Sequence, residues 1–253
     1  MNPGKLPLFP PILVCAESPR AALLPRLVRS ATVETMSRSI LLGAIACVFA
    51  LSSCAFQTAG DVQSGRRALM INQDEQALPY FQRAADSNPN YVFTYDIFHE
   101  GVWTYLGRAQ YGMGRYDEAR RSLERAISAR PDDSLAKLYL GLTLARRSEH
   151  SQGLTEIRSG LQQIYDWLEY MQWNRPFMVS WDPLGQIRSE IKKDLDMIAG
   201  KDVDWPKLLD SSEWIGQEME KEVDRVQEDE QRRFDRRDFF PYGGAGVGVG
   251  IGF

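Results

Sequence analysis

The chain of 253 residues carries 30 lysine and arginine residues against 34 aspartate and glutamate residues, a formal net charge of −4 at pH 7. Nucleic-acid binders usually have a basic domain or stripe, so this balance argues against a nucleic-acid partner. With 43% hydrophobic and 25% charged residues, the composition is that of a globular protein. Three Cys and two His, widely spaced, are too few for a four-ligand zinc site or a disulfide framework. We therefore expect neither a metal nor a cofactor.

The N-terminal region shows the pattern of a targeting segment. Residues 1–35 have no helical or strand periodicity and are interrupted by prolines. A new pattern begins at Met36, where Arg38 precedes an uninterrupted run of small and apolar residues over 40–51. Twelve residues are too few to span a hydrocarbon core of about 30 Å as a helix, but they fit the hydrophobic region of a secretory signal. We predict a signal peptide over 36–53, preceded by an over-extended N-terminus.

The hydrophobic run ends in Leu51-Ser52-Ser53-Cys54. This ending resembles the lipobox of bacterial lipoproteins, in which small residues precede a cysteine that is lipidated and becomes the mature N-terminus. The resemblance implies a covalent lipid on Cys54 as membrane anchor and a linker over 54–60. Ala55 stands where lipoproteins retained in the enterobacterial inner membrane carry Asp, which implies the outer membrane and an orientation towards the periplasm. The alternative is a buried helix with an incidental cysteine.

The segment 58–165 repeats a pattern of small and large residues, and its middle unit resembles the tetratricopeptide repeat, W-x₂-L-G-x₂-Y, A-x₃-F and a closing P. A shift of 34 residues, the family period, reaches a third unit. A first unit lies upstream of the middle one. Its spacing is longer than the family period, since the equivalent glycines, Gly65 and Gly107, are 42 positions apart. The three sets are Gly65, Ala77, Phe81, Ala84 and Pro89; Trp103, Leu106, Gly107, Ala119, Leu123, Ala126 and Pro131; and Leu140, Gly141, Gly153, Ile157 and Gly160.

The resemblance implies an all-α fold, a tetratricopeptide solenoid of helical hairpins over 61–176. Small residues at helix crossings let antiparallel helices approach closely, and about three repeats are the least that make a stable array. The match is imperfect, because Gln110 replaces the family Tyr and the third unit lacks the closing Pro. An unrelated helical bundle is the alternative.

The excess of eight residues between the first two units includes the aromatic segment 91–98. We expect this insertion to lengthen a helix and to fill the gap between the units. The alternative is a surface on which a ligand stacks.

Capping helices are predicted over 177–237. Apolar residues recur at helical spacing from Ile187 to Ile198, and Asp182-Pro183 is a suitable start for that helix. A final helix is expected to begin at Ser211 or Ser212 and to end in a solvated, charged stretch.

The tail over 238–253 alternates glycine with apolar residues. Glycine makes order costly, so a disordered tail is expected, and an edge strand paired with a partner sheet is the alternative.

No catalytic constellation is visible. His99 and His150 are the only histidines, no serine or lysine motif accompanies them, and a surface position explains both. We therefore predict that the protein is not an enzyme.

In the repeat family, the first helix of each unit lines a concave groove that binds peptides. Arg66 and Arg108 hold equivalent places in successive units, so their guanidinium groups could form a ladder for the carboxylates of an acidic peptide. The resemblance assigns to this groove Arg66, Met70, Arg108, Tyr111, Leu142 and Arg146.

The combined interpretation is a periplasm-facing outer-membrane lipoprotein whose groove binds a protein or peptide partner as a scaffold or adaptor of an envelope assembly or secretion complex. One alternative is a structural envelope lipoprotein that acts through its C-terminal tail. A more distant one is an enzyme of cell-wall or polysaccharide metabolism.

Overall fold

The computed structural model describes residues 57–95, 98–174 and 180–238. The predictions for the over-extended N-terminus, the signal peptide and the lipid on Cys54 concern segments outside these residues. So does the tail predicted over 238–253, apart from Asp238, which ends the last helix. Within the described ranges, no helix combines the length and the apolar character that a membrane crossing requires.

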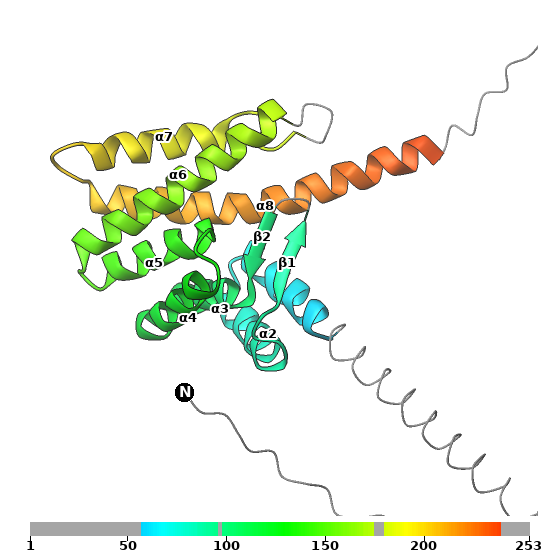
Figure 1. Ribbon diagram of the computed structural model, residues 1–253, viewed down its shortest axis with the longest axis horizontal. Helices are drawn as coiled ribbons and strands as arrows, with labels where there is room; N and C mark the ends of the chain where they lie inside the picture. The colour runs from blue at the N-terminus through cyan, green and yellow to red at the C-terminus, as the bar shows by residue number, and fades with distance from the viewer. Residues whose placement is uncertain (1–56, 96–97, 175–179, 239–253) are drawn as a thin grey trace, which may run out of the picture. The chain divides into compact units, whose positions relative to one another are not determined.

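The described chain is a series of helices with one β-hairpin (Figure 1). The all-α prediction is confirmed, and the predicted hairpins are the pairs formed by the 57–70 helix with α2, α3 with α4, and α5 with α6. In chain order the elements are the helix over 57–70, α2 (Asp74–Ser87), β1 (Val92–Tyr95), β2 (Phe98–Gly101), α3 (Val102–Gly112), α4 (Tyr116–Ala129), α5 (Ser134–Arg146), α6 (His150–Asn174), α7 (Gln186–Ala199) and α8 (Trp205–Asp238).

Each hairpin closes at a glycine that faces a large side chain sixteen positions further along. A Cβ atom on the glycine would lie 2.6 Å from the ring of Phe81 in the first hairpin and 2.5 Å from the side chain of Leu123 in the second. In the third it would lie 2.5 Å from the backbone nitrogen of Ile157. The three glycines are Gly65, Gly107 and Gly141. The predicted alternation of small and large residues is thus a set of close helix crossings.

The aromatic insertion is a β-hairpin, and the expectation of a lengthened helix is wrong. Val92 pairs with Gly101 and Tyr95 with Phe98 in an antiparallel ladder. The aromatic and β-branched residues of this short run favour an extended backbone. The hairpin does lie between units, because the ring of Phe93 contacts both. Its centroid is 4.0 Å from the guanidinium carbon of Arg66 in the first unit and 6.4 Å from the ring centroid of Tyr105 in the second.

The starts of the capping helices differ from prediction. α7 begins at Gln186, after a turn in which Gly185 has a φ of 66°; the Asp182 carboxylate still caps it by accepting from the N–H groups of Ile187 and Arg188, at 3.1 Å each.

α8 begins at Trp205 rather than at Ser211 or Ser212, because the Asp204 carboxylate accepts from the N–H of Lys207 at 3.3 Å and provides an earlier cap. The two serines instead donate their hydroxyls to Asp194 of α7, at 2.6 and 3.2 Å.

Candidate protein-binding surface

The first helices of the three units, 57–70, α3 and α5, form one face of the array, here called the groove face. α8 lies across it, packed against α5 (Figure 1). One side of α8 carries an apolar stripe at helical spacing, and Leu208, Ile215, Met219 and Val223 are all at most 2% exposed. The capping helix is therefore part of the core.

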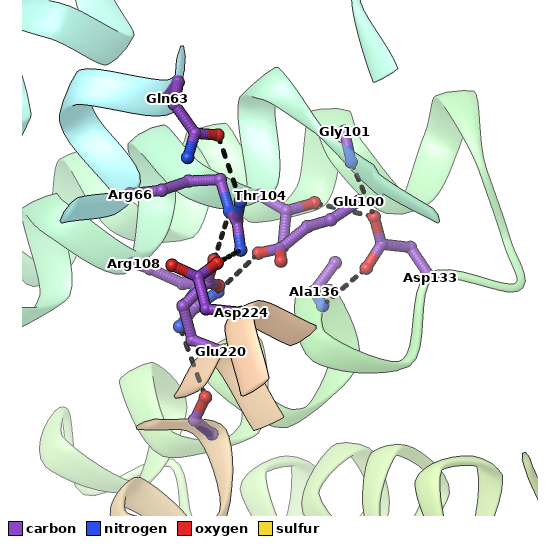
Figure 2. Close-up of polar contacts among 11 residues, drawn as sticks. Gln63, Arg66, Glu100, Gly101, Thr104, Arg108, Asp133, Ala136, Glu220 and Asp224 are labelled. Carbon is purple, nitrogen blue, oxygen red and sulfur yellow. Dashed lines mark hydrogen bonds and ion pairs between the residues drawn. The ribbon is translucent and has the colours of Figure 1, made fainter. Parts of the chain in front are cut away.

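Charged groups lie in the same interface, as Figure 2 shows. Arg66 donates from Nε to Glu220 and from Nη2 to Asp224, the latter at 2.9 Å. The Nη1 of Arg108 donates to Glu220 of α8 and to Glu100 of β2, both at 2.7 Å. Glu220 thus joins the guanidinium groups of two successive units.

Burial dominates the electrostatics of this cluster. Arg66, Arg108, Glu100 and Glu220 are at most 4% exposed, and three carboxylates, including Asp224, face two guanidinium groups. Loss of solvent raises the pKa of Glu100 to about 8, although the positive charge of Arg108 opposes the shift. Protonation of Glu100 would leave the two guanidinium groups facing two carboxylates, those of Glu220 and Asp224.

A second set of contacts continues the pattern towards α5. Arg146 donates from Nη2 to Glu213 of α8 at 2.7 Å and from Nε to the Tyr111 hydroxyl at 3.2 Å. That hydroxyl donates in turn to Glu213. Each first helix of the array therefore directs an arginine at an acidic residue of α8.

The six residues predicted for a peptide groove fall into three groups. Arg66, Arg108, Tyr111 and Arg146 contact α8, so the acidic helix that meets them belongs to the same chain. Leu142 is fully buried in the core. Met70 is half-buried and lines a cavity beside α8.

Sequence reasoning missed the acidic partners. Glu213, Glu220 and Asp224 follow one another by seven and four positions, a spacing that places them on one face of a helix. This periodicity was a readable signal for an acidic stripe. Glu100, by contrast, lies in β2 just after the aromatic segment 91–98, and no local pattern marks it.

The described residues form cavities beside α8, one small and one larger. One of about 230 Å³ is lined by Asp74, Arg108, Tyr111, Glu213 and Gln217 among others. The larger, of about 550 Å³, has Phe98, Arg130, Gln163, Trp167 and Met219 in its walls. Among the described residues no group of His, Cys, Asp and Glu side chains could hold a metal ion.

The family model of the tetratricopeptide repeat matches residues 106–159, from within α3 to within α6. The match covers most of the second and third hairpins, so the array carries a repeat that generally serves protein–protein interaction. No curated protein matches the chain.

Proposed function

We propose that this protein is a lipoprotein of the bacterial outer membrane that faces the periplasm and binds another envelope protein, as a scaffold or adaptor of an assembly or secretion complex. The observation that carries the proposal is the presence, in one chain, of the Leu51-Ser52-Ser53-Cys54 sequence and of a tetratricopeptide repeat over 106–159. The first supplies an anchor and the second a binding module.

The partner meets the array with α8 in place. Burial of an apolar side chain contributes roughly 1.5–3 kcal/mol, so removal of the four stripe residues of α8 from the groove face would cost about 6–12 kcal/mol. It would also separate Arg66 and Arg108 from Glu220. A peptide that displaced α8 would have to replace all of these contacts, so the surface open to a partner is the array together with α8.

Metabolic labelling with a palmitate analogue tests the anchor. Cys54→Ala is compared with Cys47→Ala, which removes a cysteine from the apolar run and leaves the lipobox intact. We expect label on the wild-type protein and on Cys47→Ala, and none on Cys54→Ala. Equal labelling of the two variants would remove the anchor and the membrane localisation that depends on it.

Crosslinking in intact cells followed by co-purification tests the scaffold role. We expect an envelope protein to be recovered with the wild-type chain and to be lost with Cys54→Ala, because an unanchored chain is no longer concentrated at the membrane. Recovery of no protein from crosslinked membranes would contradict the scaffold role.

A further inference from the structure

A cavity of about 310 Å³ lies between α2 and α4, the second helices of the first two units. Its floor is the side of α3 that carries Leu106 and Gln110, both of them buried. Within the described ranges none of its lining comes from α8, so it is separate from the groove face. Pockets that hold ligands usually measure roughly 300–1,000 Å³, so this one has room for a short stretch of a partner chain.

Two arginines of α4 line this cavity without a carboxylate partner. Arg121 and Arg125 are both exposed, and among the described residues neither side chain makes an ion pair or a hydrogen bond. Glu124, which lies between them on the same helix, pairs instead with Arg120 at 2.8 Å. Like charges four positions apart on a helix repel each other, so an anion bound between the two arginines would remove an unfavourable interaction.

The guanidinium group of Arg125 is held in place by an aromatic ring. Its central carbon lies 3.7 Å from the ring centroid of Trp103. The ring is fixed in turn, because the Nε1 of Trp103 donates to the carbonyl oxygen of Pro89 at 2.7 Å. Stacking uses the face of the guanidinium plane and leaves the N–H groups at its edge available as donors. Arg125 is therefore pre-organised for an acceptor, since it has less freedom to lose on binding.

The lining of the cavity favours a negative charge. Its two guanidinium groups are accompanied by a single carboxylate, that of Glu118, whose own partner is Arg115 at 3.8 Å. The arginines of the groove face differ, because they are already paired with acidic residues of α8. The unpaired guanidinium groups of α4 thus offer an acidic partner what the groove face does not.

The spacing of the two arginines fits alternate residues of an extended peptide. Side chains four positions apart on a helix start about 5–6 Å from each other. Residues i and i+2 of an extended chain point to the same side and lie about 6.6 Å apart. A segment of the form Glu-x-Glu or Asp-x-Asp can therefore direct one carboxylate at each guanidinium group, and such pairs are often bidentate.

We infer that the cavity between α2 and α4 binds an acidic segment of a protein partner, with its carboxylates on Arg121 and Arg125. A membrane surface fits less well, because the partly exposed Glu118 and Glu124 of the same helix would meet its anionic headgroups. The inference rests on the proposed function, since it assigns a chemistry to the partner of the scaffold.

Fluorescence polarisation with the full-length protein tests the inference. The probe is a labelled, acetylated Gly-Glu-Gly-Glu-Gly amide, and its control carries glutamine in place of glutamate. We expect saturable binding of the glutamate peptide and at least tenfold weaker binding of the control. Equal affinities for the two peptides would overturn the inference.

The double variant Arg121→Gln with Arg125→Gln is compared with Arg67→Gln with Arg233→Gln. The second pair removes the same charge from two arginines that are also exposed and unpaired among the described residues but lie outside this cavity. The first variant is expected to weaken the glutamate peptide at least tenfold and the second to leave its affinity unchanged, both at the melting temperature of the wild-type protein. Equal losses would indicate attraction by net charge alone and would contradict the site.

Arg125→Lys keeps the charge but loses the planar group that stacks on Trp103. We expect this variant to weaken the peptide at least threefold, whereas Arg67→Lys should bind it as the wild-type protein does. Wild-type affinity of Arg125→Lys would exclude the guanidinium group held by Trp103 as the binding group, and the inference would fall.

Sedimentation with vesicles of phosphatidylethanolamine and phosphatidylglycerol tests the membrane as the alternative ligand. We expect the wild-type protein and the variant without Arg121 and Arg125 to sediment equally. A loss of vesicle binding in that variant, together with no binding of the peptide, would assign the two arginines to lipid and overturn the inference.

The inference and the proposed function can fail separately. If the peptide does not bind while crosslinked recovery of an envelope protein succeeds, the inferred chemistry falls and the proposed function stands. If both fail, the scaffold role falls with it.

Discussion

The α5–α6 hairpin and the contact of α8 with the groove face join helices by opposite means. In the hairpin, Gly141 and Gly160 allow the backbones to touch, and the contact is apolar. Under α8, an apolar stripe is accompanied by arginines and carboxylates that are as deeply buried as the core. The first contact tolerates little added volume, whereas the second requires a complete set of charges.

The largest expected effect breaks the charged contact. Arg108→Ala leaves Glu100 and Glu220 buried without the guanidinium group they share, and loss of one partner of a buried ion pair costs about 3–5 kcal/mol. Urea unfolding at pH 7 measures this loss. The control is Arg120→Ala, whose pair with Glu124 lies at the surface and is expected to contribute about 1 kcal/mol or less. Similar losses of unfolding free energy in the two variants would contradict the view that the contact under α8 depends on its buried charges.

The next effect breaks the apolar contact. Gly141→Ala places a Cβ atom 2.5 Å from the backbone nitrogen of Ile157 and 2.8 Å from the carbonyl oxygen of Gly153, so α5 and α6 must separate. Overpacking of this kind costs about 1–3 kcal/mol of unfolding free energy. Gly60→Ala is the control, because nothing lies within 4 Å of its Cβ position, and helix propensity predicts a gain of up to about 1 kcal/mol. If Gly141→Ala had the unfolding free energy of the wild-type protein, the prediction that α5 and α6 tolerate no added volume at this crossing would be wrong.

The pH dependence of stability sharpens the comparison, because only the charged contact should titrate near neutral pH. Burial raises the pKa of Glu100 to about 8, above its ordinary value of 4.5, so between these values the folded protein binds the extra proton. Stability should therefore fall as the pH rises from about 5 to about 8, with a slope of at most about 1.4 kcal/mol per pH unit from this site.

Glu100→Gln should flatten this slope in urea unfolding measured from pH 5 to pH 9. Asp194 provides the contrast, because burial raises its pKa only to about 6, so Asp194→Asn should alter the profile below pH 6 and leave the slope above it. An unchanged slope in Glu100→Gln would assign the titration to another group.

The smallest expected effect lies at the partly exposed end of the same contact. Tyr111→Phe removes a hydroxyl that Arg146 and Glu213 share, while the ion pair between these two residues remains. A net hydrogen bond contributes about 1 kcal/mol, and thermal unfolding should show a loss of that size. Tyr170→Phe, at a ring that is 52% exposed, should have no effect. Equal melting temperatures for both variants would show that the Tyr111 hydroxyl contributes nothing.

The hairpins could be predicted from the sequence because their contacts are local. Gly65 and Phe81, like the equivalent pairs, are sixteen positions apart and follow the family pattern. The β-hairpin was missed because a short aromatic run has no period that separates a helix from a strand. The docking of α8 was missed because Arg66 and Glu220 are 154 positions apart, and no periodicity within either helix says which other helix it faces.

The same distance along the chain has a consequence for the order of folding. Contacts that close a short loop form early, whereas those that close a long one wait for the intervening chain, so we expect the three hairpins to form before α8 docks. During synthesis Arg66 and Arg108 are therefore made long before Glu220, and they stay in water until the last described helix has been released. A chain that stops before residue 205 would keep its hairpins and expose both arginines beside bare apolar surface, open to any acidic amphipathic helix that it met.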